Sequence, residues 1–263
     1  MDLGFDGAAT AVVGGTKGLG LATAELLARE GARVAVIARD DAGLEAAEVR
    51  LRAAGCRDAV RLRADIAVPE DVDAAFGELE RRWGELNALV VSPGLDTAGR
   101  AEALAAEDWT TAMRAGALGP AQCVLAALPL LRAAAWARVV TVTAMSVKRQ
   151  SPGLISYTAA KSALASITKN LARSLAADGI LVNAVAPGPM LTGWVESALG
   201  VGAGELTPVD AFRRLGGAQS MHVDLARLAA PDEVAAVVAF CASRTNSFMT
   251  GAHLNVDGGS DFC

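Results

Sequence analysis

Several residue types are scarce in this 263-residue chain, and each scarcity argues against a class of protein. The four cysteines stand singly, without a Cys-x-x-Cys pair, and only two histidines are present, so we expect neither a metal site nor a disulfide framework. The net charge of -5 indicates no nucleic-acid surface. No apolar run approaches the roughly 20 residues of a membrane span, and no secretory signal opens the chain, so we expect a cytoplasmic protein without membrane contacts.

Tyrosine occurs once, as Tyr157, and Lys161 is one of four lysines against twenty arginines. A spacing of four residues puts both side chains on one face of an α-helix. A phenol has a pKa of about 10 and is a poor acid at neutral pH unless a fixed positive charge stabilises its phenolate. Lys161 would supply that charge, and Tyr157 would then give a proton to a carbonyl oxygen as it becomes an alcohol. The alternative is that both residues only decorate an amphipathic helix.

A glycine-rich turn follows the first predicted strand. Residues 8–13 are predicted to form a buried strand and residues 21–30 a helix. In this context the backbone N–H groups of the turn and the helix N-terminus face a phosphate, whereas a glycine-rich turn alone is often only a tight corner. The residues predicted to contact a dinucleotide here are Gly14, Thr16, Lys17, Gly18, Leu19 and Gly20.

The next strand, predicted over residues 33–38, ends at Arg39. Two strands joined by a helix within about 30 residues are what a dinucleotide-binding fold requires. A site for an unphosphorylated ribose usually carries a carboxylate at this position, whereas Arg39 and Lys17 would bind a 2′-phosphate by charge-assisted hydrogen bonds. We therefore expect NADP(H) to be preferred, with NAD(H) possible. Asp40 and Asp41 follow, and an ordinary surface arginine is the alternative for Arg39.

Strands and helices alternate along the rest of the chain. Further strands are predicted at residues 60–64, 87–91, 138–143, 180–185 and 253–256, and helices at 42–54, 69–83, 105–131 with breaks near Gly116 and Gly119, around Tyr157 to about 177, and from 231. Regular alternation without a linker or repeat predicts an α/β fold, with one doubly wound parallel sheet covered by helices on both faces in a single domain over residues 1–263. Asp65 and Ile66, at the end of the third strand, are placed where an adenine ring would lie.

The longest irregular segment covers about residues 190–227, and we expect it to act as a lid over the substrate. The pocket wall is predicted to be mostly apolar, which favours a neutral cyclic or polyketide-like ketone over a sugar phosphate. Its expected members are Leu95, Asp96, Met145, Leu154, Trp194 and the segment from there to His222, which could orient a substrate. A surface position in a mobile segment is the alternative for His222.

Six motifs, in this order, give the chain a family likeness over essentially its full length. They are Gly14-x-x-x-Gly18-x-Gly20, Asp65, Gly94, Tyr157-x-x-x-Lys161, Asn183-Ala184-Val185-Ala186-Pro187-Gly188 with Thr192, and Val256-Asp257-Gly258-Gly259. In these motifs the sequence resembles the classical short-chain dehydrogenase/reductases. The resemblance implies a Rossmann-type domain with a seven-stranded sheet, which uses a nicotinamide cofactor to reduce a carbonyl or to oxidise an alcohol.

The resemblance also implies roles for individual residues. Tyr157 would be the acid/base, and Lys161 would hold the nicotinamide ribose and lower the tyrosine pKa. A homodimer or homotetramer is implied, paired through the helical segments at residues 105–131 and 156–177. The remaining cofactor contacts that we expect are Ser92, Gly94, Pro187, Gly188, Met190 and Thr192.

Ala144 is the first departure from the family pattern, because the family's catalytic serine stands thirteen residues before the tyrosine. Ser146 would supply the missing hydroxyl if its loop takes a different path, and a purely structural serine is the alternative. Thr143 is expected to point along its strand.

Two further positions also differ from the family. The family's helical asparagine is replaced by Gly116, which would leave room for a water molecule or break a proton relay. The usual Asn-Asn-Ala-Gly after the fourth strand reads Val-Ser-Pro-Gly from Val91. Two side-chain amides that brace the cofactor region are therefore absent.

The retained acid/base pair decides between the functional hypotheses. Removing one preorganised donor costs on the order of a hundredfold to a thousandfold in rate, so a slow or specialised enzyme is favoured over an inactive one. The leading hypothesis is an NADPH-dependent ketoreductase with Tyr157, Lys161 and Ser146 as catalytic residues. The alternatives are a dinucleotide-binding sensor or structural subunit, and an epimerase or dehydratase that uses the same cofactor.

Overall fold

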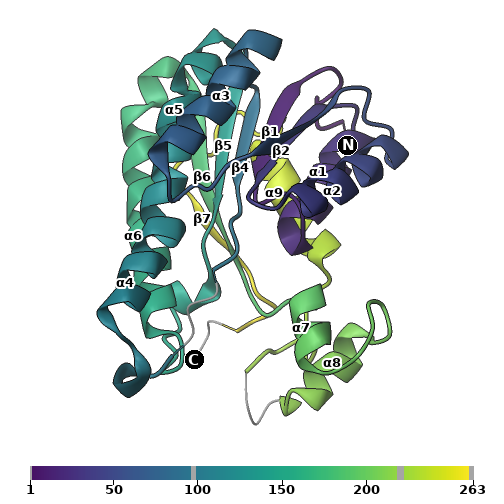
Figure 1. Ribbon diagram of the computed structural model, residues 1–263, viewed down its shortest axis with the longest axis vertical. Coiled ribbons are helices and arrows are strands. Elements are labelled where there is room, and N and C mark those ends of the chain that lie inside the picture. Colours follow the sequence, from purple (N-terminus) through teal and green to yellow (C-terminus); the bar gives the residue numbers. More distant parts are fainter. Residues whose placement is uncertain (1, 96–98, 218–221, 261–263) are drawn as a thin grey trace.

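A seven-stranded parallel sheet runs through the centre of the molecule (Figure 1). The computed structural model describes residues 2–95, 99–217 and 222–260. The strand order β3-β2-β1-β4-β5-β6-β7 changes direction between β1 and β4, which is the doubly wound, Rossmann-type arrangement that the sequence predicted. The strands are β1 (Ala9–Val13), β2 (Arg33–Ala38), β3 (Ala59–Arg63), β4 (Ala88–Val91), β5 (Ala137–Val142), β6 (Ile180–Pro187) and β7 (His253–Val256).

The central strands are apolar on both faces because both faces are covered. All five residues of β1 are buried. Ala11 and Val13 pack with the apolar side chains of the helices on one face, whereas Val12 packs with those on the other. This division follows from the strand's period of two. A continuous apolar run was therefore the right signal for a strand buried between two helical layers.

Helices cover the sheet on two sides (Figure 1). One side carries α1 (Gly18–Arg29), α2 (Asp41–Ala53) and α9 (Pro231–Ala242). The other carries α3 (Pro69–Trp83), α4 (Ala106–Met113), α5 (Gly119–Ala133) and α6 (Ile155–Ser174). The bounds of β2, α3 and β7 agree with those predicted, and most others differ by one to three residues, as helix and strand ends usually do.

The predicted break in the long fourth helix is a π-helical turn, η2 (Arg114–Leu118), between α4 and α5. A π-turn inserts one extra residue into a helix and commonly marks a functional site. By length and composition alone, the run Ala106–Ala133 could cross a membrane, but half of its most apolar window is buried inside the structure. That burial is what a core helix shows.

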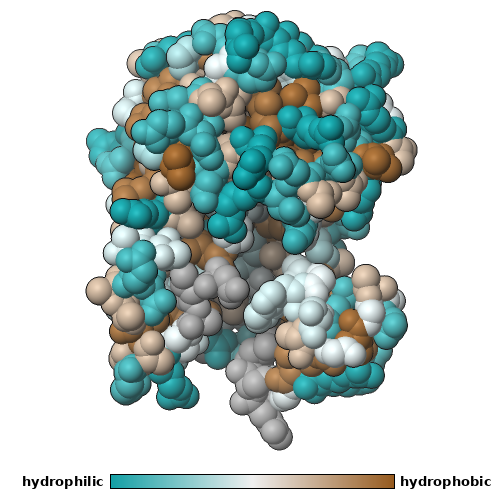
Figure 2. Space-filling view, in the orientation of Figure 1, coloured by the Kyte–Doolittle hydropathy of each residue, from teal (hydrophilic) through white to brown (hydrophobic). Residues whose placement is uncertain are grey.

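A small lobe lies below the carboxyl edge of the sheet, and a hollow separates it from the body in the space-filling view (Figures 1 and 2). The segment was predicted to be irregular, but it contains α7 (Gly193–Ala198) and α8 (Pro208–Arg214). Thr207 caps α8 by accepting a hydrogen bond from the Asp210 N–H, and Pro208 occupies its first turn, so a local start signal was present. The lobe has an apolar cluster of its own, formed by Leu206, Ala211, Phe212, Val223 and Leu228.

Candidate active site

The carboxyl ends of the parallel strands meet at one edge of the sheet, and the predicted site residues follow them. The glycine-rich turn follows β1, Arg39 follows β2, Asp65 comes two residues after β3, and Ser92 follows β4. Binding sites in doubly wound sheets lie outside this edge, at the point where the strand order reverses. Here that point is the gap between β1 and β4.

The glycine-rich turn is packed too tightly to accept side chains. A Cβ atom on Gly14 would overlap the Ser92 carbonyl oxygen, and one on Gly20 would overlap the Gly14 carbonyl oxygen. Gly14 also has a φ of 76°, which favours glycine. The turn thereby brings bare backbone to the N-terminus of α1, whose first turn contains no acidic residue. This is a cradle in which a pyrophosphate fits.

Thr192 lies beside this cradle, because its Cγ2 atom is 3.6 Å from the position of a Cβ atom on Gly18. Pro187 ends β6, and Gly188 packs so closely on Asp257 that a Cβ atom would be 2.6 Å from the Asp257 Cα. Met190 pairs with Ala229 at an isolated bridge where the chain enters the lobe. The predicted segments after β1 and β6 are therefore adjacent in space.

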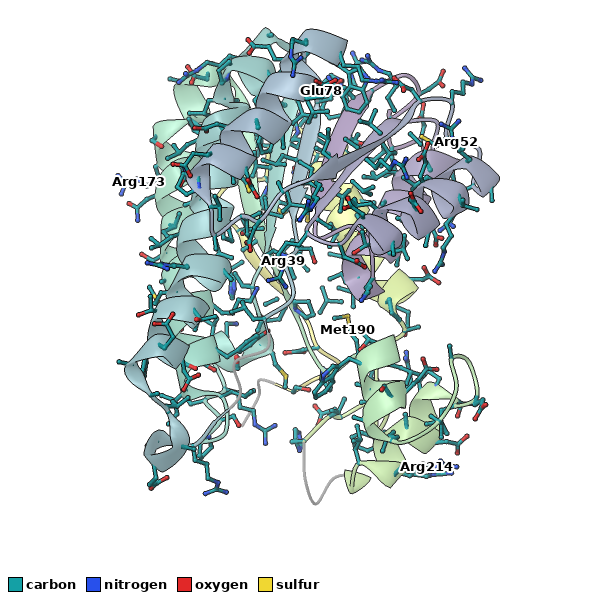
Figure 3. All side chains as sticks on the ribbon, viewed as in Figure 1. Arg39, Arg52, Glu78, Arg173, Met190 and Arg214 are labelled. Carbon is teal, nitrogen blue, oxygen red and sulfur yellow. The ribbon has the colours of Figure 1, made fainter. Side chains whose placement is uncertain are left out.

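Arg39 extends from the end of β2 with 76% of its side chain exposed, and its Nη1 atom is 3.9 Å from Asp65 Oδ2 (Figure 3). Asp40 is occupied elsewhere, because its carboxylate accepts the Gly43 N–H at 2.9 Å and caps α2. Asp41 lies 3.8 Å from Arg63. Asp40 thus has a structural role, whereas Asp41 and Arg39 are both exposed and each makes one long ion pair among the residues described.

Asp65 is fixed by the start of the next loop. Its Oδ1 atom accepts the Ala67 N–H at 2.9 Å, and its own N–H donates to Asp71 Oδ2. Ile66 is 9% exposed, and its carbonyl oxygen packs on Gly119. These contacts hold the third strand's end against α5, where it can form one wall of an adenine pocket.

Tyr157 and Lys161 stand one turn apart on α6. The Lys161 side chain is 2% exposed, and its Nζ atom donates to the Val142 carbonyl oxygen at 2.8 Å. The same Nζ atom lies 5.9 Å from the centre of the Tyr157 ring. The end of β5 thus anchors the ammonium group beside a half-buried phenol.

Burial dominates the protonation of this pair. It lowers the Lys161 pKa to about 8, because the charged ammonium is desolvated. It also raises the Tyr157 pKa. We expected Lys161 to lower the Tyr157 pKa, but in this structure the Tyr157 pKa is raised. Desolvation of the phenolate outweighs the attraction of the Lys161 ammonium group, which lies 5.9 Å from the ring centre.

Ala144 stands between β5 and the short turn η3 (Met145–Val147), where the family has a serine. Thr143 does not replace it: its Oγ1 atom donates to the Val185 carbonyl oxygen at 3.2 Å and lies 2.8 Å from His253 Nε2. Ser146 is 3% exposed, and its Oγ atom has no hydrogen-bond partner among the residues described. Its hydroxyl is thus unpaired but covered.

His253 is a residue that the sequence did not connect with the site. Its ring holds Thr143, 110 residues earlier in the chain, at the strand end that precedes Ala144. Burial, with a smaller effect of Lys148, lowers the His253 pKa, so a neutral ring is favoured. Only the pairing of β5, β6 and β7 brings the two residues together, and no local pattern indicates it.

Gly116 is sealed and leaves no room for the water molecule that we considered. A Cβ atom there would lie 2.8 Å from Ala160 Cβ and 2.9 Å from Leu95 Cδ1. Leu95 therefore occupies the space beside the π-turn, near Ala160, the residue that precedes Lys161 on α6. Leu95, which was predicted to line the substrate pocket, therefore packs against Gly116.

The other predicted wall residues are spread over two sides of the hollow. Leu154 is tied to the loop after β4 through a bridge to Gly99. On the lobe side, Trp194 is 71% exposed, and His222 lies 2.7 Å from Asp224 through its Nε2 atom. Met145 opens the η3 turn. Asp96 lies outside the residues described.

Within residues 2–95, 99–217 and 222–260, no group of three or more His, Cys, Asp or Glu side chains is arranged to hold a metal ion.

Comparisons with known proteins agree with this geometry. A family model described as "Enoyl-(Acyl carrier protein) reductase" matches residues 13–261. The cis-4-hydroxycyclohexanecarboxylate dehydrogenase of Sinomonas cyclohexanicum is 34% identical over 249 residues, which cover 94% of each chain.

Two solved structures are similar over nearly the whole chain. L-sorbose reductase from Gluconobacter frateurii, complexed with NADPH and L-sorbose, has a TM-score of 0.90 at 25% identity and full coverage of both chains. An NADPH-bound short-chain oxidoreductase from Pseudomonas aeruginosa PAO1, described as containing an atypical catalytic center, has a TM-score of 0.88 at 29% identity, with 97% of this chain and 98% of that one covered.

The doubly wound parallel sheet, with its glycine-rich turn at the switch point, defines a Rossmann-type protein of the oxidoreductase class. The chain belongs to the short-chain dehydrogenase/reductase family and is an enzyme of that family.

The buried ammonium makes stability depend on pH. Below about pH 8 the folded and unfolded chains both hold the Lys161 proton, and between about pH 8 and 10.4 only the unfolded chain does. Stability therefore rises with pH in this window, by up to about 3 kcal/mol from this group. We expect the difference in unfolding free energy between wild type and Lys161→Met to change by this amount in urea titrations at pH 7.5 and 10.

Lys169→Met is the matched control, because it removes an exposed lysine of the same helix. If both proteins fold and the difference between their unfolding free energies is the same at pH 7.5 and pH 10, the Lys161 ammonium group is not desolvated as described.

Proposed function

We propose that the chain is an NADPH-dependent ketoreductase that converts a carbonyl into an alcohol. The observation that carries this proposal is the Tyr157–Lys161 pair, held beside the carboxyl edge of the sheet by the bond from Lys161 Nζ to the Val142 carbonyl oxygen. The glycine cradle and the exposed Arg39 guanidinium fit a phosphorylated dinucleotide. NADPH, when bound, supplies the hydride.

Tyr157 moves the proton in this proposal. Its hydroxyl donates to the substrate oxygen as the carbonyl carbon becomes tetrahedral, and the resulting phenolate is stabilised by the Lys161 ammonium. At neutral pH Lys161 keeps its charge, since its pKa is about 8. The polar contact with substrate should also lower the high phenol pKa, because hydrogen bonds to the charged form favour it.

We propose Ser146 as the hydroxyl that holds the substrate carbonyl. It is two residues from Ala144, and its Oγ atom has no competing partner among the described residues, whereas Thr143 is bound to Val185 and His253. Because Ser146 is covered, the η3 turn must shift to expose it. A substrate with a hydroxyl of its own beside the carbonyl would reduce the need for that shift.

The lobe is proposed to close over the substrate. Trp194 and Leu225 are 71% and 61% exposed on it. These large apolar side chains, together with Leu95 and Met145, favour a neutral, cyclic or polyketide-like ketone. Among the relatives, one name mentions a cyclohexane ring that carries a carboxylate and another mentions the neutral sugar L-sorbose, so both named molecules are compact.

The central test is Tyr157→Phe. We expect it to lower kcat by about a hundredfold to ten-thousandfold with a panel of cyclic ketones, because the proton donor is lost, while NADPH binding measured by fluorescence stays within about twofold of wild type. Ser146→Ala should lower kcat by about a hundredfold to a thousandfold if its hydroxyl is the carbonyl anchor. Turnover by Tyr157→Phe equal to that of wild type would exclude the proposed mechanism.

The second candidate function is a dinucleotide-binding sensor or structural subunit. Ala144 and the sealed position at Gly116 favour it. NADPH binding without ketone-dependent oxidation in the wild type, over the same panel, would select this alternative.

Arg39 is proposed to set the preference for NADPH. We expect Arg39→Ala to weaken NADPH binding about tenfold to hundredfold, since a charge-assisted contact contributes about 1.5–3 kcal/mol, and to leave NADH binding nearly unchanged. Arg52→Ala is the control, because Arg52 is an exposed arginine of α2 that already pairs with Glu48. Equal losses for both cofactors would show that Arg39 does not contact the 2′-phosphate.

We also propose a homo-oligomer formed through the α4–α5 surface. Trp109, Leu118 and Leu125 are large apolar side chains of this segment and are 39%, 56% and 56% exposed. Leu125→Arg should convert a dimer or tetramer into a smaller species in light scattering, whereas Val49→Arg, on exposed α2, should not. A monomeric wild type would refute this part.

A further inference from the structure

Arg149 joins three segments that are far apart in the sequence. It follows the η3 turn, and its Nη1 atom donates to the Ser260 carbonyl oxygen at 2.9 Å and to the His222 carbonyl oxygen at 3.3 Å. Ser260 lies beyond β7, and His222 belongs to the segment that returns from the lobe to α9. One guanidinium group therefore holds the loop after β5 against both the lobe and the C-terminal segment.

The chemistry of the guanidinium group makes this junction firm. The group stays protonated at every pH at which the protein works, and hydrogen bonds from a charged donor are stronger than those between neutral groups. Nη1 carries two hydrogens, so a single nitrogen can serve both carbonyl acceptors. The junction therefore does not depend on the titration of Arg149.

The turn that precedes Arg149 is a hydrogen-bonded unit. The Val147 N–H donates to the Ala144 carbonyl oxygen at 3.1 Å. The N–H groups of Lys148 and Arg149 both donate to the Met145 carbonyl oxygen, at 3.0 and 3.1 Å. Because the backbone from Ala144 to Arg149 is bonded in this way, fixing the Arg149 side chain also fixes the turn.

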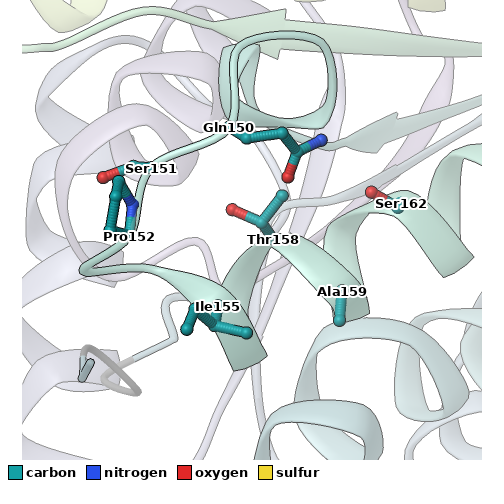
Figure 4. Close-up of a pocket in the computed structure, with 7 residues that line it drawn as sticks. All are labelled: Gln150, Ser151, Pro152, Ile155, Thr158, Ala159 and Ser162. Carbon is teal, nitrogen blue, oxygen red and sulfur yellow. The ribbon is translucent and has the colours of Figure 1, made fainter. Parts of the chain in front are cut away.

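The loop that follows Arg149 passes through Ser151 and Pro152 into the first turn of α6 (Figure 4). The Gln150 side-chain amide donates to the Val147 carbonyl oxygen at 3.2 Å, which ties this loop back to the turn. Arg149 thus stands between the η3 turn and the helix that carries the proposed proton donor.

The segment from the lobe packs closely on the C-terminal segment. The Leu225 N–H donates to the Gly258 carbonyl oxygen at 3.1 Å, and a Cβ atom on Gly259 would overlap the Asp224 carboxylate. The Leu225 side chain nevertheless remains 61% exposed. The two segments that accept hydrogen bonds from Arg149 therefore form one unit, and this unit presents an apolar side chain of the lobe.

Arg149 thereby links the two walls of the proposed substrate pocket. Met145 opens the η3 turn on one side, and Leu225 lies on the lobe at the other side. With the junction in place, the distance between these walls is set before a ligand arrives. A compact ligand can then contact both walls without the entropic cost of ordering them.

We propose that Arg149 is a positioning residue that sets the width of the substrate pocket and so selects compact ketones. This inference rests on the proposed function, because it takes the hollow between the body and the lobe as the place of the ketone. Arg149 is assigned no contact with the reacting atoms. Its role is therefore separable from proton and hydride transfer.

Binding of two alcohols to the NADPH-loaded chain, measured by calorimetry, tests the width. Cyclohexanol has one ring and trans-2-decalol has two fused rings, and no hydride passes because cofactor and alcohol are both reduced. Arg149→Met keeps an unbranched side chain but removes the donors. We expect it to raise the cyclohexanol Kd about tenfold and to change the decalol Kd by less than about threefold, because only the larger ligand still spans the separated walls.

Amide hydrogen exchange tests the junction without a ligand. In Arg149→Met, residues 147–149 and 225–226 should both exchange about tenfold faster, since each loses the same restraint. Arg149→Lys, whose single nitrogen can donate to both carbonyls, should keep both measurements within about threefold of wild type. Arg214→Met, at an exposed arginine of α8, is the control and should change neither (Figure 3).

Equal weakening of both alcohols, or a lowered Tm with an unchanged ratio of the two Kd values, would reduce Arg149 to a structural contact and overturn the proposal. Faster exchange on only one side, no recovery in Arg149→Lys, or no binding of cyclohexanol to wild type would overturn it too. Failure of the proposed function gives a different result. A wild type that shows this size dependence but reduces no ketone would refute the reductase and leave the role of Arg149 intact.

Discussion

The buried ammonium group of Lys161 is the constraint around which the site is built. A cation with 2% exposure and a single carbonyl partner among the described residues is costly, because desolvation penalises the charged form. Burial lowers its pKa to about 8, so it is still charged at neutral pH, and the Val142 carbonyl oxygen at the end of β5 accepts one of its hydrogens. Hydrophobic packing alone gives no reason for a lysine at this position, whereas the proposed role of the neighbouring phenol as a proton donor does.

The surroundings of this lysine are arranged to bring backbone close to it. Ala160 and Gly116 are both small, so the π-turn η2 can approach α6, and Leu95 fills what space remains. On the other side of the sheet's edge, Gly14 and Gly20 allow the turn after β1 to fold tightly on itself. Small residues thus allow two close approaches: the turn after β1 folds on itself, and η2 packs against α6 beside the buried Lys161. Burial in a medium of low dielectric strengthens the attraction between an ammonium group and a phenolate.

Local patterns predicted the fold well because each strand and helix can be identified from a few consecutive residues. The buried run of β2, the Pro69 start of α3 and the glycine-rich turn all needed only nearby sequence. Contacts between distant segments were out of reach. Leu95 against Gly116 and Thr143 against His253 depend on strand register and side-chain packing, which no periodicity encodes. The direction of the Tyr157 pKa was missed for the same reason, since it follows from burial in the folded chain.

The replacement of the family's serine by Ala144 still leaves the proposed chemistry possible. A hydroxyl that orients the carbonyl contributes about 3–4 kcal/mol to the transition state, whereas the proton donor and its cation act on the bond that forms. The chain keeps the proposed proton donor and its cation, Tyr157 and Lys161, at least partly buried. The Thr143 hydroxyl is engaged by His253 and the Val185 carbonyl oxygen, so it does not take the place of the hydroxyl that Ala144 lacks. We therefore expect an apolar wall at Ala144 to favour substrates with a hydrogen-bonding group beside the carbonyl. Such a group could form a hydrogen bond with the Tyr157 hydroxyl and orient the carbonyl without a serine.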